Sequence, residues 1–320
     1  MSIIFAASEA AYLTGYPVSG SWYQDQNYSR NASGVGQSNA ASVNIGTLLT
    51  PDSNGYWVSF LICNSLYRPN SYLTNEWFKL LDSTTPGGTG SVGLARGDPI
   101  KITKWTSAGY ATFDSSYYYP RDNSRLTIRM HIFQDGADGR IKLYVGDTLY
   151  GDVTLTGETL RPFDHLFFAG PSNYASDTYG ISEIIVADES LIGCRLRTAY
   201  VTGNGSETAW DGSYTDVDDI VHESTAITTT TDDAVSTFVH NKSITQNIRG
   251  VAVTAKASVG DNAGIDAVLR IGGVNYTKTP NGLLKKVPQT LSAVWTTNPA
   301  TDSPFTGSDV SGLQFGVKKT

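Results

Sequence analysis

The sequence RLTIRMHIFQDGADGRIKLYVGDTLYGDVTL, residues 125–155, decides the fold of the first half of the chain. Side chains of two kinds alternate through residues 126–133, which is the period of a β-strand. One face of this strand would carry Leu126, Ile128, Met130 and Ile132, and the other Thr127, Arg129, His131 and Phe133. The turn-forming segment DGADG follows at residues 135–139, and the alternation resumes at Ile141, Leu143 and Val145. The stretch therefore predicts an antiparallel β-hairpin.

The second strand of this hairpin carries a pattern that occurs in one group of β-sandwiches. Its residues Ile141, Leu143, Tyr144 and Val145 are followed by Gly146-Asp147. A strand, a short polar turn and a strand of this pattern resemble the central hairpin of laminin-G-like and concanavalin-like jelly rolls. The resemblance implies a lectin-like sandwich in the first half of the chain, closed by a strand at residues 183–188.

The rest of the chain shows the same short alternating segments, and helical patterning is almost absent. The segments continue beyond residue 190, beginning with an expected strand at residues 195–201. With 320 residues, the chain is long enough to bury two cores. We expect an all-β protein with two β-sandwich, jelly-roll-like domains in series. Residues 1–192 would form the lectin-like domain and residues 193–320 a smaller sandwich for assembly.

Residues 295–318, WTTNPATDSPFTGSDVSGLQFGVK, contain signals for a turn, a short helix and a closing strand. Pro299 and Pro304 confine the segment between them to turn or edge geometry. Asp309 is able to cap a short helical turn through its side-chain oxygen. The strand that follows would have one buried face, formed by Leu313, Phe315 and Val317.

The order of these elements resembles the C-terminal signature of a large family of tailed-bacteriophage virion structural proteins. The matching residues are the turn Asn298-Pro299-Ala300-Thr301, the pair Phe305-Thr306, the Asp-led helix at 307–310 and the strand end Gly316-Val317-Lys318. The same family resemblance extends over residues 181–223. There, a strand ending in acidic residues is followed by a Gly-rich turn, Trp210 and an acidic stretch.

The two resemblances together imply a non-enzymatic bacteriophage virion structural protein that is oligomeric and tail- or fibre-associated. Residues 1–190 would project and contact a host-surface glycan, and residues 196–320 would carry the assembly contacts. The partners would be other virion proteins, copies of this chain and the glycan. The location would be the virion, assembled in the host cytoplasm. One alternative is a capsid decoration or head-fibre protein, and an alternative from another class is a carbohydrate-binding or carbohydrate-cleaving protein.

Charge and hydropathy exclude two kinds of partner. The formal net charge of -7, without a long basic cluster, argues against nucleic acid. No uninterrupted apolar run is long enough to span a bilayer, so we expect no membrane partner. The first residues, MSIIFAASEAAYL, contain Glu9 and no basic residue, so we expect no secretory signal.

Patterns that carry catalysis are missing from the sequence. A glycosidase of this fold needs paired carboxylates on one face of a strand, but Glu183 and Asp188 are expected to face opposite ways. The 4 histidines show neither a nucleophile signature nor zinc spacing. We therefore expect no enzyme activity and no cofactor. The one metal alternative is calcium at Asp135 and Asp138, although the preference of Asp-Gly for turns explains both residues.

Loops rich in aromatic and polar residues are the candidates for binding. Such residues suit saccharide stacking and equally suit interfaces between subunits, and we favour the interface. The candidates, for glycan or interface, are Trp22, Tyr23, Tyr28, Tyr72, Tyr117, Tyr118, Tyr119 and Asn123.

Overall fold

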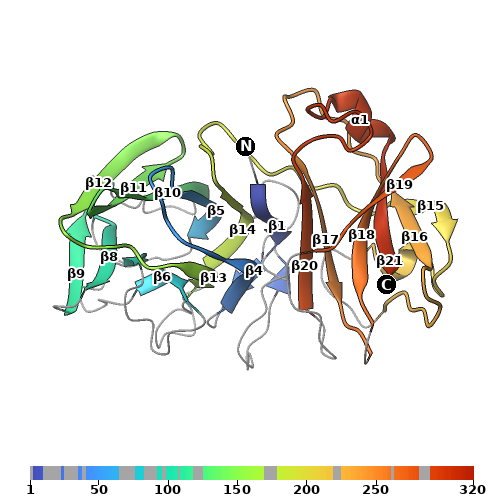
Figure 1. The fold of residues 1–320 in the computed structure, drawn as a ribbon, viewed down its shortest axis with the longest axis horizontal. Helices are drawn as coiled ribbons and strands as arrows, with labels where there is room; N and C mark the ends of the chain where they lie inside the picture. Colours follow the sequence, from blue (N-terminus) through green and yellow to red (C-terminus); the bar gives the residue numbers. More distant parts are fainter. Residues whose placement is uncertain are drawn as a thin grey trace. The chain divides into compact units, whose positions relative to one another are not determined.

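The computed structural model describes residues 3–9, 23–24, 35–37, 41–64, 76–82, 92–95, 99–106, 109–117, 125–168, 179–218, 225–260, 263–280 and 289–320 (Figure 1). Their regular structure is nearly all β-strand, which confirms the predicted all-β sandwich class. Two compact units are present, Ser8–Leu196 and Arg197–Thr320, and the second unit also contains Met1–Ala7. No helix in these described ranges is long and apolar enough to cross a membrane.

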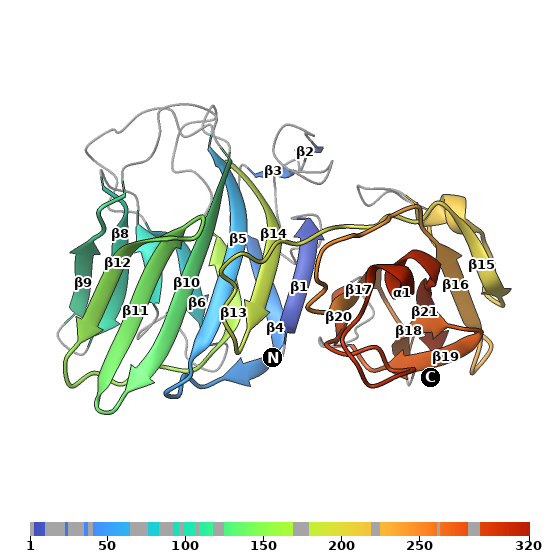
Figure 2. The ribbon, with the colours of Figure 1, turned by 90° about the horizontal axis from the view of Figure 1, so that it is seen from above.

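Two antiparallel sheets make up the first unit. The first sheet has the order β12-β11-β10-β5-β14-β3-β2, and Figure 2 shows β12, β11, β10 and β5 side by side. The strands in this order are β12 (Thr148–Leu155), β11 (Asp138–Val145), β10 (Arg125–Asp135), β5 (Tyr56–Asn64), β14 (Tyr179–Ala187), β3 (Val35–Gln37) and β2 (Tyr23–Gln24). Strand β1 (Ile3–Glu9) also pairs with β14. The second sheet, in spatial order, consists of β4 (Ala41–Leu49), β13 (Phe163–Phe168), β6 (Glu76–Leu81), β7 (Val92–Ala95), β8 (Lys101–Thr106) and β9 (Gly109–Asp114).

Aromatic rings from both sheets meet in the core of the first unit. The ring centroid of Phe60 on β5 lies 4.8 Å from that of Phe78 on β6 and 5.3 Å from that of Phe168 on β13. All three side chains are fully buried. Pairs of this kind contribute about 0.5–1.5 kcal/mol beyond the burial of their area. The core therefore defines which face of β5 and of its neighbours points inward.

The predicted hairpin at residues 125–155 is confirmed. Strand β10 pairs with β11 in antiparallel register, ending with Asp135 opposite Asp138. The turn itself is Gly136-Ala137, which is tighter than the expected DGADG turn, and Gly136 has a φ of 62°. Glycine is favoured at that first central position of a two-residue hairpin loop. The inward set of β10 is buried as predicted at Ile128, Met130 and Ile132, whereas Leu126 is half-buried.

Two further sheets make up the second unit. The larger has the order β15-β16-β21-β18-β19, and the smaller pairs β17 with β20. The strands are β15 (Gly203–Thr208), β16 (Val235–Val239), β21 (Gln314–Lys319), β18 (Ile265–Ile271), β19 (Val274–Lys278), β17 (Val251–Ala257) and β20 (Gln289–Trp295). Two short helices, η2 (Tyr214–Asp216) and α1 (Gly307–Gly312), complete the unit.

The predicted helical turn near the C-terminus is confirmed, with Thr306 as the N-cap of α1. The Asp309 carboxylate accepts a hydrogen bond from the Thr306 backbone N–H at 2.7 Å, and Thr306 Oγ1 accepts one from the Asp309 N–H at 3.2 Å. These reciprocal bonds form a capping box, which satisfies two donors that the helix leaves open. Val310 of α1 then packs with Phe305 and Leu313 in the core of the second unit.

The second unit also contains the first residues of β1 (Ile3–Glu9). The carbonyl of Ala6 accepts hydrogen bonds from Thr254 Oγ1 at 3.2 Å and from Ser292 Oγ at 3.1 Å. These donors lie on β17 and β20, so a segment from the start of the chain packs on the smaller sheet.

One expectation for the second half of the chain is wrong, and another is confirmed only in part. Residues 195–201 form no regular element, because alternation alone does not make a strand that has no paired neighbour. Leu313 is buried as predicted and Phe315 packs against the core, but in β21 Gly316 is buried while Phe315 and Val317 are half-buried. The reason is close packing of the sheet, since a Cβ on Gly316 would meet the backbone oxygen of Ser236 on β16.

Candidate functional site

Aromatic and charged side chains gather on the outer face of the first sheet, opposite to the core. The strand registers place Trp57, His131, Lys142 and Asp152 directly opposite one another across β5, β10, β11 and β12. Phe133 and Arg140 form the neighbouring pair on β10 and β11. We define the outer strip as Trp57, His131, Phe133, Arg140, Lys142, Tyr144 and Asp152.

The rings of the outer strip are stacked. His131 lies 4.6 Å from Trp57 with an interplanar angle of 10°, and 4.5 Å from Phe133 with an angle of 20°, measured between ring centroids. Tyr144 tilts against Trp57 at 5.3 Å. Because each ring is held by its neighbours across strands, the positions of these side chains are fixed before any ligand arrives.

Two cations lie over the Phe133 ring. Arg140 Cζ is 5.7 Å and Lys142 Nζ is 5.6 Å from the ring centroid. Asp152 joins both cations, with Arg140 Nη2 at 2.8 Å from Oδ1 and Lys142 Nζ at 3.9 Å from Oδ2. The hydrogen bond with Asp152 is the main cause that raises the pKa of the Arg140 guanidinium above its ordinary value. The side chains of Arg140, Lys142 and Asp152 are 24%, 28% and 35% exposed, so the charges reach solvent.

His131 is the histidine of the strip, and its surroundings favour the neutral imidazole. Burial lowers the pKa of the His131 imidazole, and the charge of Lys142 acts in the same direction, while a hydrogen bond to the Asn54 carbonyl opposes them. Nε2 lies 2.8 Å from that carbonyl oxygen. A carbonyl only accepts, so Nε2 carries the proton. The Asn54 turn is itself fixed, because Asp52 Oδ1 accepts the backbone N–H groups of Asn54 and Gly55 at 2.9 Å.

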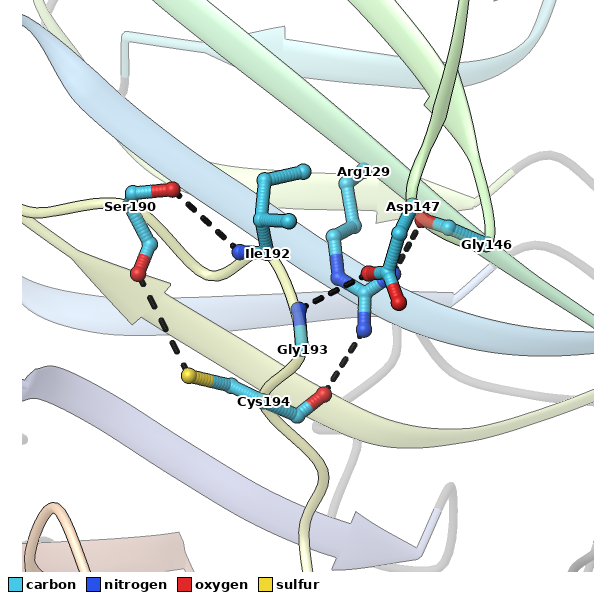
Figure 3. Close-up of polar contacts among 7 residues, drawn as sticks. All are labelled: Arg129, Gly146, Asp147, Ser190, Ile192, Gly193 and Cys194. Atoms are coloured by element: carbon cyan, nitrogen blue, oxygen red, sulfur yellow. Dashed lines mark hydrogen bonds and ion pairs between the residues drawn. The ribbon is translucent and has the colours of Figure 1, made fainter.

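Arg129 lies beside the outer strip, and its hydrogen bonds and ion pair connect two segments of the first unit (Figure 3). Its guanidinium pairs with Asp147 at 2.8 Å and donates to the carbonyl of Gly146. A third bond runs to the Cys194 carbonyl at 2.7 Å, and Asp147 Oδ1 also accepts the Gly193 N–H at 2.8 Å. Arg129 is only 2% exposed. These bonds hold the β11–β12 turn against the segment that follows β14.

The predicted binding loops lie mostly outside the described residues. Trp22, Tyr28, Tyr72, Tyr118, Tyr119 and Asn123 fall in undescribed segments, and Tyr23 is described only as backbone of β2. Tyr117 is described, and its ring meets Tyr150 of β12 edge-on at 4.8 Å. Its carbonyl accepts the Ile100 N–H at 3.0 Å, while the adjacent Ser116 binds the Tyr150 carbonyl through its N–H at 2.8 Å. Tyr117 therefore belongs to the contact between the two sheets at β8 and β12.

The calcium candidates have protein partners in the structure. Asp135 Oδ2 lies 3.5 Å from Arg140 Nη1, and Asp138 Oδ1 accepts the Gly157 N–H at 2.8 Å. Within the described ranges, no group of three or more His, Cys, Asp or Glu side chains is placed to hold a metal ion. These contacts are the hairpin and turn roles that Asp-Gly sequences favour.

Strand β14 departs from regular alternation at Glu183. A register shift between Ser182 and Ile185 marks a β-bulge, and Glu183 has a φ of 54° with 5% of its surface exposed. Such a conformation costs a non-glycine residue about 1–3 kcal/mol. Asp188 lies exposed after the end of the strand. The expectation that the carboxylates of Glu183 and Asp188 face opposite ways assumed a strict period of two, and the bulge breaks that period.

The outer strip was not proposed as a binding site from the sequence. Alternation correctly placed Arg129, His131 and Phe133 on the face away from the core. The signal that could have identified the strip is the presence of rings on that face, where an antiparallel sheet normally carries polar residues. Its members on β5 and β12 could not be predicted from the sequence, because the pattern of one strand does not give its register with the neighbouring strands.

Comparison with known proteins gives no family. A scan of family models and a search of curated proteins both find no match. Among solved structures, the globular domain of T. cruzi calreticulin is 13% identical with a TM-score of 0.43, covering 59% of this chain and 89% of that chain. The carbohydrate-binding module CBM66 from Bacillus subtilis is 12% identical with a TM-score of 0.34, covering 57% and 98%. The receptor-binding domain of botulinum neurotoxin type G is 11% identical with a TM-score of 0.41, covering 88% and 80%. Similarities this low carry no argument about function.

Proposed function

We propose that this chain is a non-enzymatic, adhesive structural protein of a tailed-phage virion, whose first unit is a lectin-like module that contacts a host-surface glycan. The observation that carries the adhesive part is the outer strip, where fixed rings adjoin charged groups that reach solvent. Saccharide sites combine apolar ring surface with a few fixed hydrogen-bonding groups in this way.

The virion part of the proposal is supported by the closing segment of the chain. The turn at Asn298 and the capping box of Thr306 and Asp309 lead directly into β21. Asn298 is buried, and its side chain accepts the Ala300 N–H at 2.9 Å, which fixes the turn. This is the order of elements in the phage signature that the sequence resembles. Other virion proteins and further copies of the chain are the partners that this role requires.

A glycan array probed with the labelled intact chain tests the adhesive function. We expect concentration-dependent binding to a restricted set of glycans, because fixed polar groups discriminate between hydroxyl arrangements. Incubation of each bound glycan with the chain, followed by mass spectrometry, should return it unaltered. Absence of any bound glycan would refute the adhesive function, and a cleaved glycan would support the carbohydrate-cleaving alternative.

Antibody labelling of intact phage particles tests the structural role. We expect label on the tail or its fibres, visible by electron microscopy. Label on the head would support the decoration alternative, and unlabelled particles would refute virion membership.

A further inference from the structure

We infer that the outer strip binds a neutral saccharide, whose hydroxyl groups are held between Asp152 and the cations Lys142 and Arg140. The inference rests on the proposed lectin-like function and names the site and the ligand class for it. Three observations on the strip support the inference. The Lys142–Asp152 ion pair is longer than a hydrogen bond, the cations and carboxylates are equal in number, and the stacked rings are held in position by one another.

The ion pair between Lys142 and Asp152 leaves room for a hydroxyl group. Their closest atoms are 3.9 Å apart, which is longer than a hydrogen bond. A hydroxyl both donates and accepts, so one oxygen can donate to Asp152 Oδ2 while it accepts from Lys142 Nζ. Hydrogen bonds to charged groups are worth about 1.5–3 kcal/mol each. The gap therefore matches the chemistry of a sugar hydroxyl.

Arg140 offers a second position next to the first. Its Nη2 is already bonded to Asp152 Oδ1 at 2.8 Å, and Nη1 lies 3.5 Å from Asp135. A guanidinium carries five N–H donors, and these two contacts use two of them. The guanidinium is thus held in place by carboxylates while some of its donor capacity remains. Two neighbouring hydroxyls, as on a sugar ring, would use both positions.

The balance of charge favours a neutral ligand. Two cations, Arg140 and Lys142, face two carboxylates, Asp152 and Asp135. An anionic sugar would gain from Lys142 but would approach both carboxylates, and like charges placed close together are unfavourable. A purely apolar ligand would remove water from all four charges without replacing its hydrogen bonds. A neutral sugar ring avoids both costs, because it carries no charge and its hydroxyl groups replace the hydrogen bonds of the displaced water.

The rings beside these charges provide an apolar surface that does not need to reorganise. His131 and Phe133 are half-buried and stacked, and Tyr144 leans on Trp57. The Tyr144 pKa is raised by burial and by the charge of Asp152, so its hydroxyl stays protonated and available as a donor. Binding to a fixed surface avoids the ordering cost that a mobile loop would incur.

The test uses the intact chain on an array of neutral oligosaccharides and matched ones bearing sialic or uronic acid, followed by titration with the strongest binder. For Asp152→Asn we expect affinity to fall about tenfold to a hundredfold, the loss of one charge-assisted hydrogen bond. Lys142→Gln should weaken the same glycan. The control is Asp114→Asn, which removes the carboxylate of a comparable exposed ion pair, Lys101–Asp114 at 3.3 Å on the other sheet, and should bind as the wild type does.

The outcomes distinguish failure of the proposed saccharide site from failure of the proposed adhesive function. A wild type that binds neutral glycans while both strip variants bind equally well would overturn the strip as the site and leave the adhesive function standing. Binding confined to acidic glycans would overturn the ligand class. If no glycan binds the wild type, the adhesive function itself fails. Thermal unfolding of each variant is recorded alongside. Lys142→Gln, at a half-buried position whose ion pair is open at 3.9 Å, keeps the test valid should Asp152→Asn be unstable.

Discussion

Two polar surfaces of this molecule, one on a sheet of each unit, differ in how fully their hydrogen bonds are used. In the second unit, Gln314 Oε1 accepts from the Ser206 N–H at 2.8 Å, from Ser206 Oγ at 2.9 Å and from Thr237 Oγ1 at 2.9 Å. We call these three residues the Gln314 cluster. In the outer strip of the first unit, by contrast, the pair of Lys142 and Asp152 is open at 3.9 Å.

The difference indicates which polar groups mainly stabilise the fold and which remain available to bind a ligand. A polar group whose bonding capacity is used within the protein stabilises the fold, and it has little left for a ligand. Strand β15 comes close enough to close the Gln314 cluster because Gly205 has no side chain, and a Cβ there would meet Thr237 Oγ1 and Gln314 Oε1. No comparable closure is described over the charges of the outer strip. The comparison therefore predicts large effects on stability at the cluster and large effects on binding at the strip.

The largest effect is expected at Gly316, which lies opposite Thr237 in the sheet. In Gly316→Ala the new Cβ would meet the backbone of Ser236 and Thr237, which cannot move without breaking the ladder. We expect a loss of about 3 kcal/mol or more in the free energy of unfolding of the second unit. Urea unfolding, with hydrogen exchange at residues 263–280 to locate the effect, measures it. The matched control is Gly312→Ala, where a Cβ meets nothing within 4 Å. Equal stability of the two variants would contradict the close packing at β21.

The next effect is expected at the centre of the Gln314 cluster. Gln314→Leu keeps the approximate volume and removes the shared acceptor, leaving the buried Thr237 hydroxyl without it. We expect a loss of about 2 kcal/mol, within the usual cost of stranding a buried polar group. Ser206→Ala serves as the control, because this exposed residue can bond to water instead, and should cost less than about 1 kcal/mol. A larger loss in the control would show that the cluster is not organised around Gln314.

A smaller effect on stability is expected at the outer strip. Asp152→Asn removes an ion pair at a side chain that is 35% exposed, and Arg140 keeps Asp135 as a neighbour. We expect the free energy of unfolding to change by less than about 1 kcal/mol, as for most solvent-exposed pairs. Should the loss match that of Gln314→Leu, the strip would be a structural network like the cluster, and the distinction between the surfaces would fail.

The sequence predicted local features of both regions better than it predicted their assembly. The alternation in residues 126–133, the turn after Asp135 and the helix after Thr306 follow from neighbouring residues alone, and the structure confirms them. Such features depend on backbone preference and on the period of apolar side chains.

The features that sequence reasoning missed depend on residues far apart in the chain. The open pair of Lys142 and Asp152 and the bond of Thr237 to Gln314 exist only once strand registers are set. The bulge at Glu183 and the packing of Ala6 on β17 and β20 are likewise decided by neighbours in space. A single sequence contains no direct record of those pairings, so the outer strip could not be assembled from the sequence alone.

The smallest effect is a loss of stability at acid pH, and it compares one histidine from each unit. Burial is the main cause that lowers the pKa of both His131, in the outer strip, and His240, in the second unit. Each ring has Nε2 beside a carbonyl oxygen, at 2.8 Å from Asn54 and at 3.0 Å from Val310. The unfolded chain, with an ordinary histidine pKa of about 6.5, therefore binds protons at a higher pH than the folded chain does. Stability is fully present above that pH and is lost as the pH falls through it towards the folded values.

We expect the free energy of unfolding to decrease between about pH 7 and about pH 5, with hydrogen exchange rising at residues 125–145 and at residues 235–257. His131→Gln should reduce the pH dependence only in the first of these segments, and His240→Gln only in the second. Because the two rings belong to different units, each variant is the control for the other. If His131→Gln left the acid response of residues 125–145 unchanged, the titrating group near the outer strip would be another side chain, and the neutral state of His131 would no longer explain the acid response of the strip.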